Sequence, residues 1–98
     1  MKTRVELDPQ VVKFIRSLPP EPRRLLRAAL RGLERGKGDL RSLEGDLSGY
    51  YRLRVGSYRV VVRFYLIRGQ RVTRCVFAER RSVVYELFAE LLTGETQN

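Results

Sequence analysis

Arginines alternate with apolar residues in the most basic part of this sequence. Residues 49–81 contain nine arginines and a single acidic residue, Glu79. Because successive side chains of a strand point to opposite faces, alternate arginines would lie on one face of a sheet. The arginines predicted to share that face are Arg52, Arg54, Arg59 and Arg63. A guanidinium is always charged and can bind a phosphate through two hydrogen bonds, so this pattern predicts a phosphate-binding surface.

A second group of polar residues lies where the last predicted strand meets the final predicted helix. Arg80 and Arg81 stand directly before Ser82, a favourable residue for capping a helix N-terminus. Backbone N–H groups at such a terminus favour a bound anion. Tyr85 follows in the first turn, where its phenol could transfer a proton or stack on a base. Each of these residues, considered alone, is as typical of an ordinary solvent-exposed surface as of a binding site. Only their convergence on one face favours a binding site.

The composition excludes several kinds of active site. The chain has no histidine and one cysteine, so a conventional zinc site, a histidine general base and a serine–histidine–aspartate triad are excluded. Catalysis would depend on Arg, Lys, Tyr, Ser, Asp or Glu, and we expect no metal and no cofactor. The net charge is +9, and residues 49–81 supply nearly all of it. A charge concentrated in this way favours nucleic acid as the partner.

The length of 98 residues predicts a single domain spanning residues 1–98. No stretch approaches the run of about 18 apolar residues that a membrane helix needs. The first ten residues, MKTRVELDPQ, lack the apolar centre of a secretory signal. The lone Cys75 cannot form an internal disulfide, which fits a reducing compartment. We therefore expect a cytoplasmic protein that does not bind membranes.

The spacing of apolar residues predicts an α+β domain with the element order β-α-α-β-β-β-α. The predicted strands cover residues 3–7, 50–55, 58–67 and 70–78. The predicted helices run from Asp8 to Leu18, from Glu21 to Gly36 and from Ser82 to Gly94, with Asp8 and Ser82 as N-caps. A polar connection, residues 37–48, follows the N-terminal helical hairpin. Three consecutive strands joined by tight turns predict an antiparallel sheet core.

The two faces of the predicted sheet differ in character. In residues 58–67, Val60 and Val62 point away from Arg59 and Arg63. The apolar face is expected to pack on the helices, because burial of apolar side chains drives folding. The arginine face is then expected to be exposed as a cationic surface.

Two segments of the sequence resemble the RelE/ParE toxin superfamily. The first is LEGDLSGYYRLRVGSYRVVVRF, residues 43–64, and the second is ERRSVVYELF, residues 79–88. Members of this family typically have a Y-R-L-R-V-G-x-Y-R-V block and an R-x-x-V-Y start to the last helix. The predicted element order is also that of the family, so the resemblance covers nearly the whole chain and implies a RelE-like fold.

The resemblance implies a role for each matching residue. Arg52 and Arg54 match two basic residues of the family's second strand, which are lysines in its best-known ribonucleases. Arg59 matches an arginine that contacts the scissile phosphate. Arg81 and Tyr85 match the R-x-x-V-Y pair, so Arg59, Arg81 and Tyr85 are the candidate catalytic residues. Arg52, Arg54, Arg63 and Arg80 are the candidate RNA-binding residues.

The implied function is that of an mRNA endoribonuclease toxin, which acts on translating ribosomes and is neutralised by a cognate antitoxin protein. The sequence departs from the family pattern at Glu79, where the nucleases often have an arginine. The proton-transfer group is therefore open between Tyr85 and Glu79. Two alternatives remain: a non-enzymatic toxin of the ParE type that inhibits DNA gyrase, and a degenerate member that binds only its antitoxin.

Overall fold

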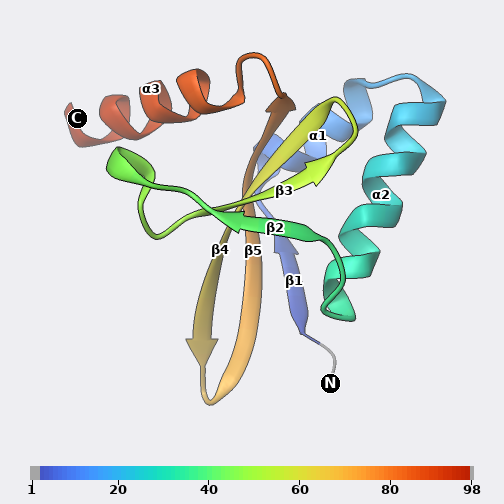
Figure 1. Cartoon of the computed structure of the whole chain (residues 1–98), viewed down its shortest axis with the longest axis horizontal. Helices are drawn as coiled ribbons and strands as arrows, with labels where there is room; N and C mark the ends of the chain where they lie inside the picture. Colours follow the sequence, from blue (N-terminus) through green and yellow to red (C-terminus); the bar gives the residue numbers. More distant parts are fainter. Residues whose placement is uncertain (1–2, 98) are drawn as a thin grey trace.

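Five strands form a single sheet, with helices on both of its faces (Figure 1). The structure is a computed structural model that describes residues 3–97. Its strands are β1 Arg4–Leu7, β2 Asp39–Ser42, β3 Tyr51–Val55, β4 Tyr58–Ile67 and β5 Gln70–Arg80. Its helices are α1 Pro9–Ser17, α2 Pro20–Glu34, α3 Val84–Gln97 and a short 3-10 helix, η1 Gly45–Leu47. None of the helices in residues 3–97 is long and apolar enough to cross a membrane.

The two N-terminal helices form the predicted hairpin. α1 starts at Pro9 and ends at Ser17, shortly before Pro19 and Pro20, because proline has no backbone N–H to continue a helix. Asp8 is the N-cap by position, as predicted. Its carboxylate does not cap the helix, however, and instead accepts a hydrogen bond of 2.6 Å from Arg74 of β5. This ion pair joins the start of α1 to the sheet.

The main core lies between the helical hairpin and one face of the sheet. Its buried side chains come from α1, α2, β3, β4 and β5, and they include Val11, Leu26, Leu53, Val60 and Val62. All five are at most 1% exposed. Val60 and Val62 therefore face the helices, as their alternation with Arg59 and Arg63 predicts.

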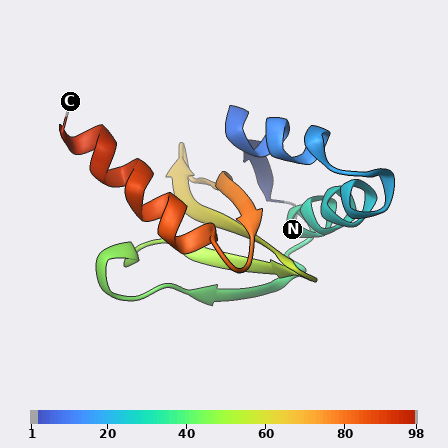
Figure 2. The ribbon, with the colours of Figure 1, turned by 90° about the horizontal axis from the view of Figure 1, so that it is seen from above.

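A second, smaller apolar cluster lies on the opposite face, beneath α3. It consists of Val61, Phe77, Val84 and Phe88, and the last two belong to α3. The expectation that the whole arginine face is exposed is therefore wrong, because α3 packs on that face around Val61. Figure 2 shows α3 separated from the α1–α2 hairpin. The arginines occupy the part of the face that α3 leaves open.

The sheet differs from the predicted one in two respects. Residues 39–42 form β2, an edge strand, inside the segment that the sequence predicts to be a polar connection. Leu40 is the single partly buried residue of this strand, so it produces no visible alternation. In addition, β1 pairs in parallel with β5, so the sheet is mixed, with strand order β1-β5-β4-β3-β2. A parallel pair joins segments far apart in sequence, and local patterns do not reveal it.

The last helix has different ends from those predicted. α3 begins at Val84, so Ser82 lies in the preceding turn and is not the N-cap. The helix also continues through Gly94 to Gln97 instead of stopping at Gly94. A single glycine lowers helix stability but does not by itself end a helix.

Candidate nucleic-acid interface

Four charged residues form a row across the sheet. The strand register places Asp39 opposite Arg54, Arg54 opposite Arg59, and Arg59 opposite Glu79. Residues directly opposite each other in antiparallel strands share a face. The row therefore has two arginines at its centre and a carboxylate at each end.

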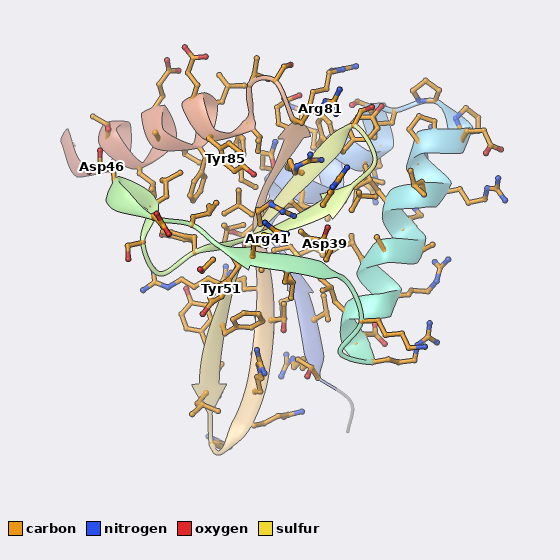
Figure 3. All side chains as sticks on the ribbon, viewed as in Figure 1. Asp39, Arg41, Asp46, Tyr51, Arg81 and Tyr85 are labelled. Atoms are coloured by element: carbon orange, nitrogen blue, oxygen red, sulfur yellow. The ribbon has the colours of Figure 1, made fainter. Side chains whose placement is uncertain are left out.

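The neighbouring row changes from basic to apolar. It consists of Arg41, Arg52, Val61 and Phe77. Val61 and Phe77 belong to the cluster beneath α3, so the helix covers that end of the row. Arg41 and Asp39 are absent from the predicted set of site residues, because they lie on β2. Figure 3 labels both and shows them on the strand nearest the viewer.

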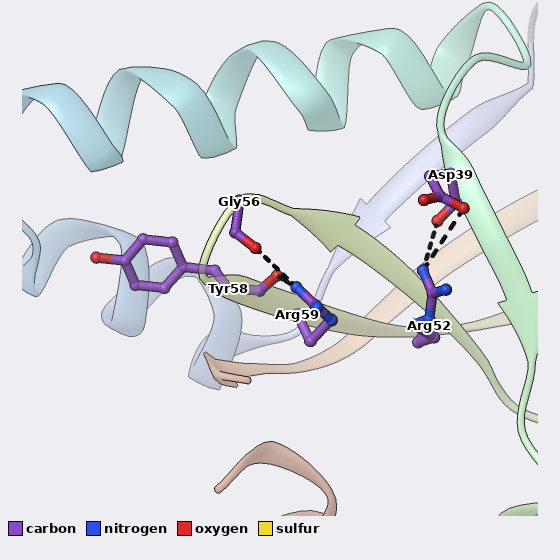
Figure 4. A network of polar contacts seen from close by, with 5 residues as sticks. All are labelled: Asp39, Arg52, Gly56, Tyr58 and Arg59. Atoms are coloured by element: carbon purple, nitrogen blue, oxygen red, sulfur yellow. Dashed lines mark hydrogen bonds and ion pairs between the residues drawn. The ribbon is translucent and has the colours of Figure 1, made fainter. Parts of the chain in front are cut away.

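Arg59 is anchored at the turn between β3 and β4. Its Nη1 donates hydrogen bonds to the carbonyls of Gly56 and Tyr58, each 2.8 Å long (Figure 4). Gly56 has a φ of +57°, a conformation that favours glycine and permits this tight turn. The side chain of Arg59 forms no other hydrogen bond within residues 3–97, so its remaining N–H groups are available to a ligand.

Arg81 reaches the same turn from the end of β5. Its backbone N–H donates a hydrogen bond of 2.8 Å to the carbonyl of Ser57, the residue that follows Gly56. Arg81 is exposed, and Figure 3 shows it near the hairpin of β3 and β4. Arg54, opposite Arg59 in the register, is exposed as well. We refer to Arg54, Arg59 and Arg81 as the turn cluster.

Arg52 is engaged with β2. Its Nη1 donates a hydrogen bond of 3.2 Å to the backbone carbonyl of Asp39 and lies 3.6 Å from the Oδ1 atom of the same residue (Figure 4). The side chain of Arg52 is 15% exposed. To bind an RNA phosphate, Arg52 would have to give up its contacts with Asp39. In this structure its role is to hold β2 against β3.

Arg63 lies away from the turn cluster, on the distal part of β4. Its guanidinium donates a hydrogen bond of 3.2 Å to the hydroxyl of Tyr50 and lies 5.1 Å from the centre of that ring. It also lies 5.7 Å from the ring centre of Tyr65. Arg63 is nevertheless exposed. Tyr50 in turn packs edge-on against Phe88 of α3, which fixes its position.

Arg80 and Glu79 lie on different faces of β5. Arg80 pairs with Tyr58, whose ring packs against Phe14 of α1, so Arg80 starts on the side of the helical hairpin. Glu79 is on the face of Arg59, and its carboxylate accepts a hydrogen bond of 3.0 Å from the backbone N–H of Arg80. The Nη1 atom of Arg80 lies 3.7 Å from the Oε1 atom of Glu79, so the guanidinium turns back toward this carboxylate. Arg80 is therefore paired with Glu79 and, unlike Arg54 and Arg59, does not start on the arginine face.

Tyr85 borders the apolar cluster beneath α3. Its side chain is partly buried against that cluster, and Figure 3 shows it on the side of α3 that faces the sheet. Its hydroxyl has no hydrogen-bond partner among the described residues. The ring is thus fixed by packing while the hydroxyl is free to bind a ligand.

These positions separate the predicted residues into groups. The backbones of Arg54, Arg59 and Arg81 lie beside one turn, and Tyr85 lies on the neighbouring helix above the same face. Arg52 lies beside them and contacts Asp39 of β2. Arg63 lies farther along β4, where it binds Tyr50, and the Cβ of Arg80 points to the opposite face of the sheet. Grouped guanidinium groups on an open sheet surface can bind consecutive phosphates of a single strand.

Comparisons with solved structures identify several proteins of the same fold. A chain in the crystal structure of the archaeal RelE–RelB complex from Pyrococcus horikoshii is 32% identical, with a TM-score of 0.62, and the match covers 83% of this chain and 97% of that chain. A chain of the toxin–antitoxin complex RelBE2 from Mycobacterium tuberculosis is 19% identical, with a TM-score of 0.70, and the match covers 83% of this chain and 100% of that one.

A third similar structure is a YoeB/ParE toxin from Agrobacterium tumefaciens. It is 16% identical, with a TM-score of 0.62, and the match covers 81% of this chain and 99% of that chain. No protein-family model matches the sequence, and no curated protein matches it. The similarity at 32% identity extends over most of both chains, whereas the two more distant structures support the fold alone.

Proposed function

Because this chain belongs to the RelE/ParE toxin superfamily, we propose that it is the toxin of a toxin–antitoxin pair and that it cleaves mRNA on the ribosome, in the cytoplasm. The observation that carries this proposal is the turn cluster. Arg54 faces Arg59 in the strand register, and the backbone of Arg81 is hydrogen-bonded to the turn that precedes Arg59. The guanidinium of Arg59 is already oriented by two backbone carbonyls. Charged groups that are held in place before a reaction stabilise developing charge most effectively.

The proposed chemistry is an attack by an mRNA 2′-hydroxyl on the adjacent phosphorus. The 2′-hydroxyl loses its proton, the new O–P bond forms, and the bond to the 5′-oxygen breaks as that oxygen gains a proton. Arg59 and Arg81 would stabilise the added negative charge on the phosphate oxygens. Arginine remains protonated at physiological pH, so it cannot accept the proton itself.

Tyr85 is the better placed of the two candidates for proton transfer. Its hydroxyl is not engaged with any described residue, whereas the carboxylate of Glu79 already accepts the backbone N–H of Arg80. Glu79 could serve instead if its carboxylate turns toward the row that contains Arg59.

The test is single-turnover cleavage of a defined mRNA on programmed ribosomes, with the cuts mapped by primer extension. The proposal predicts discrete cuts in the codon positioned in the A site and none in the same mRNA without ribosomes. The nuclease assignment would be rejected if the mRNA on ribosomes stays uncut when the chain is added at the concentration that arrests growth in cells.

One observation favours the alternative of a gyrase inhibitor. Glu79 lies in the same row as Arg59, and a carboxylate on this face repels phosphate. The two functions are distinguished by the uptake of labelled methionine and thymidine after the chain is expressed without an antitoxin. The nuclease proposal predicts that methionine incorporation falls first. Earlier loss of thymidine incorporation would favour a ParE-like action on DNA synthesis.

The proposed partner is an acidic antitoxin that covers the arginine face. A strongly basic surface attracts acidic segments and accelerates their association. Because Arg54 and Arg81 are exposed, an antitoxin could neutralise them without disturbing the core. The M. tuberculosis structure is a toxin–antitoxin complex and the P. horikoshii structure is a RelE–RelB complex, which supports the expectation of a protein partner.

A further inference from the structure

The distal half of β4 has an open edge. β4 spans Tyr58–Ile67, but β3 pairs only with its first five residues, up to Val62. Residues 63–67 pair with β5 on one side and have no strand of the described chain on the other. Figure 1 shows this end of the β4–β5 hairpin projecting away from the helices. An open edge presents backbone N–H and C=O groups that can pair with another strand.

The open edge has few of the features that usually prevent pairing, and its single charge is that of Arg63 at the inner end. Residues 63–67 contain no proline and no lysine, and the register irregularity of β4 lies earlier, between Val61 and Val62. Large apolar side chains are exposed here: Leu66 is 77% exposed, Ile67 50% and Tyr65 39%. Proteins normally protect such edges with charges, proline or bulges. Residues 64–67 contain none of these, and an exposed apolar edge of this kind indicates a surface that another chain covers.

The side chains around the edge define the chemistry of a strand that could pair with it. On one face, Arg63 lies at the inner end, held by Tyr50. On the other face, Phe64 packs edge-on against Tyr51, and the guanidinium of Arg71 lies 4.1 Å from the centre of its ring. The edge is therefore apolar at its centre and basic at its margins.

We propose that residues 63–67 bind an extended segment of a partner protein, which adds to the sheet as a strand beside β4. The segment would have apolar residues opposite Phe64 and Leu66 and an acidic residue opposite Arg63. A second copy of this chain is a poor occupant, because each chain carries a net charge of +9 and would bring further arginines to the edge. This site is separate from the turn cluster and requires neither nuclease activity nor gyrase binding.

The experiment begins with the full chain and an array of seven-residue peptides. Their three central positions are Val, Ile, Thr or Ser, and their flanking positions are Glu, Gln or Lys. The proposal predicts binding to peptides with apolar centres and a flanking Glu, and no binding to the same centres flanked by Lys. One fluorescent Glu-flanked peptide is then titrated against the chain and its variants.

Substitutions at the edge and elsewhere supply the matched controls. Leu66→Lys should weaken binding by roughly 10-fold or more, because it removes the apolar contact and charges the edge. Leu25→Lys, at another exposed leucine on α2, should leave the affinity unchanged. Arg63→Gln should weaken binding of the Glu-flanked peptide and not of its Gln-flanked analogue. Hydrogen exchange should show new protection of amides within residues 63–67.

Several results would overturn the proposal. The first is that the Leu66→Lys variant binds the peptide as tightly as the unsubstituted chain does. The second is that the peptide protects amides in another strand, and the third is that the array shows no preference for flanking Glu over flanking Lys. Sedimentation gives a further outcome: self-association that Leu66→Lys abolishes would assign the edge to a second copy of the chain. Each of these readouts is independent of the mRNA cleavage assay, so the two proposals can fail separately.

Discussion

The arginines of the turn cluster differ in how firmly each one is held. Arg59 has two backbone acceptors for its Nη1, whereas the guanidinium groups of Arg54 and Arg81 have no partner among residues 3–97. A side chain that is already oriented loses less conformational entropy when it binds a ligand. Arg59 is therefore the residue of the cluster in which a change of charge should affect the transition state most.

Replacement of Arg59 by alanine should lower the rate of mRNA cleavage by roughly 100-fold or more, the usual effect of losing one pre-organised charge-stabilising group. Arg68→Ala is the control, because Arg68 lies at the tip of the β4–β5 hairpin, far along β4 from the turn cluster. Both variants are assayed in single turnover on programmed ribosomes. Equal rates for the two would show that the candidate face is wrongly assigned.

Tyr85→Phe separates proton transfer from stacking, since it removes the hydroxyl and keeps the ring. If the phenol transfers a proton, the cleavage rate should fall by about 100- to 10,000-fold. The packing against Val84 and Phe88 is retained, so the free energy of unfolding should change little. A small change in rate would assign the ring to stacking and transfer the role of general base to Glu79.

Cys75 should be an unreactive thiol in the folded chain. It is fully buried, and burial raises the pKa of its thiol to about 12. The thiol of the unfolded chain ionises near pH 8.5, so its contribution to folding stability is complete below that pH and is lost as the pH rises toward about 12. Alkylation by iodoacetamide at pH 8 should be roughly 100-fold slower, or more, than in urea. Comparable rates would show that the site opens readily.

At the level of elements, β2 determines how the arginine face is presented. β2 places Arg41 and Asp39 beside β3, and the contacts of Arg52 with Asp39 hold the two strands together. Gly38 precedes this strand with a φ of +140°, and an added Cβ would lie 2.8 Å from the side chain of Leu53. The approach of β2 to the core therefore depends on glycine at this position.

The C-terminal end of α3 can be tested at Gly94. The helix runs through this residue, and no atom within 4 Å would obstruct an added Cβ. Gly94→Ala should therefore stabilise the helix, by up to about 1 kcal/mol in the free energy of unfolding, because alanine has the higher helix propensity. The measurement is urea denaturation followed by circular dichroism. Destabilisation would indicate that the helix ends at Gly94, as the sequence pattern predicts.

On the scale of the whole molecule, charge is distributed unevenly along the chain. The central 33 residues carry most of the net charge of +9, while residues 82–98 contain three glutamates and no basic residue. Clustered positive charge steers acidic or nucleic-acid partners toward the molecule at low salt. The antitoxin and RNA should therefore compete for the same face.

An acidic antitoxin bound to this chain should weaken its binding to a short RNA. The expected cause is that both partners need Arg54 and Arg81, and that the antitoxin reduces the positive field around them. The measurement is a titration of a labelled RNA oligomer with the chain alone and with the preformed complex. If the complex binds RNA as tightly as the free chain does, the antitoxin docks on another surface.

Much of this molecule can be predicted from the sequence because its strongest signals are local. Alternation of Val60 and Val62 with Arg59 and Arg63 identifies β4 and its two faces, and the bounds of that strand agree with those in the structure. The helical hairpin follows from apolar spacing and the Pro19–Pro20 break. The spacing of apolar residues and the residue types of turns depend only on neighbouring positions, so both can be recognised in the sequence without knowledge of the fold.

The features that the sequence patterns do not predict depend on contacts between segments that are distant along the chain. The existence of β2 requires pairing with β3, since four residues with one partly buried side chain carry no clear period. The sequence likewise leaves open which arginines meet. Arg59 and Arg81, 22 positions apart, reach one turn because β5 runs beside β4. Arg80, next to Arg81 in the sequence, starts on the opposite face because successive strand side chains alternate.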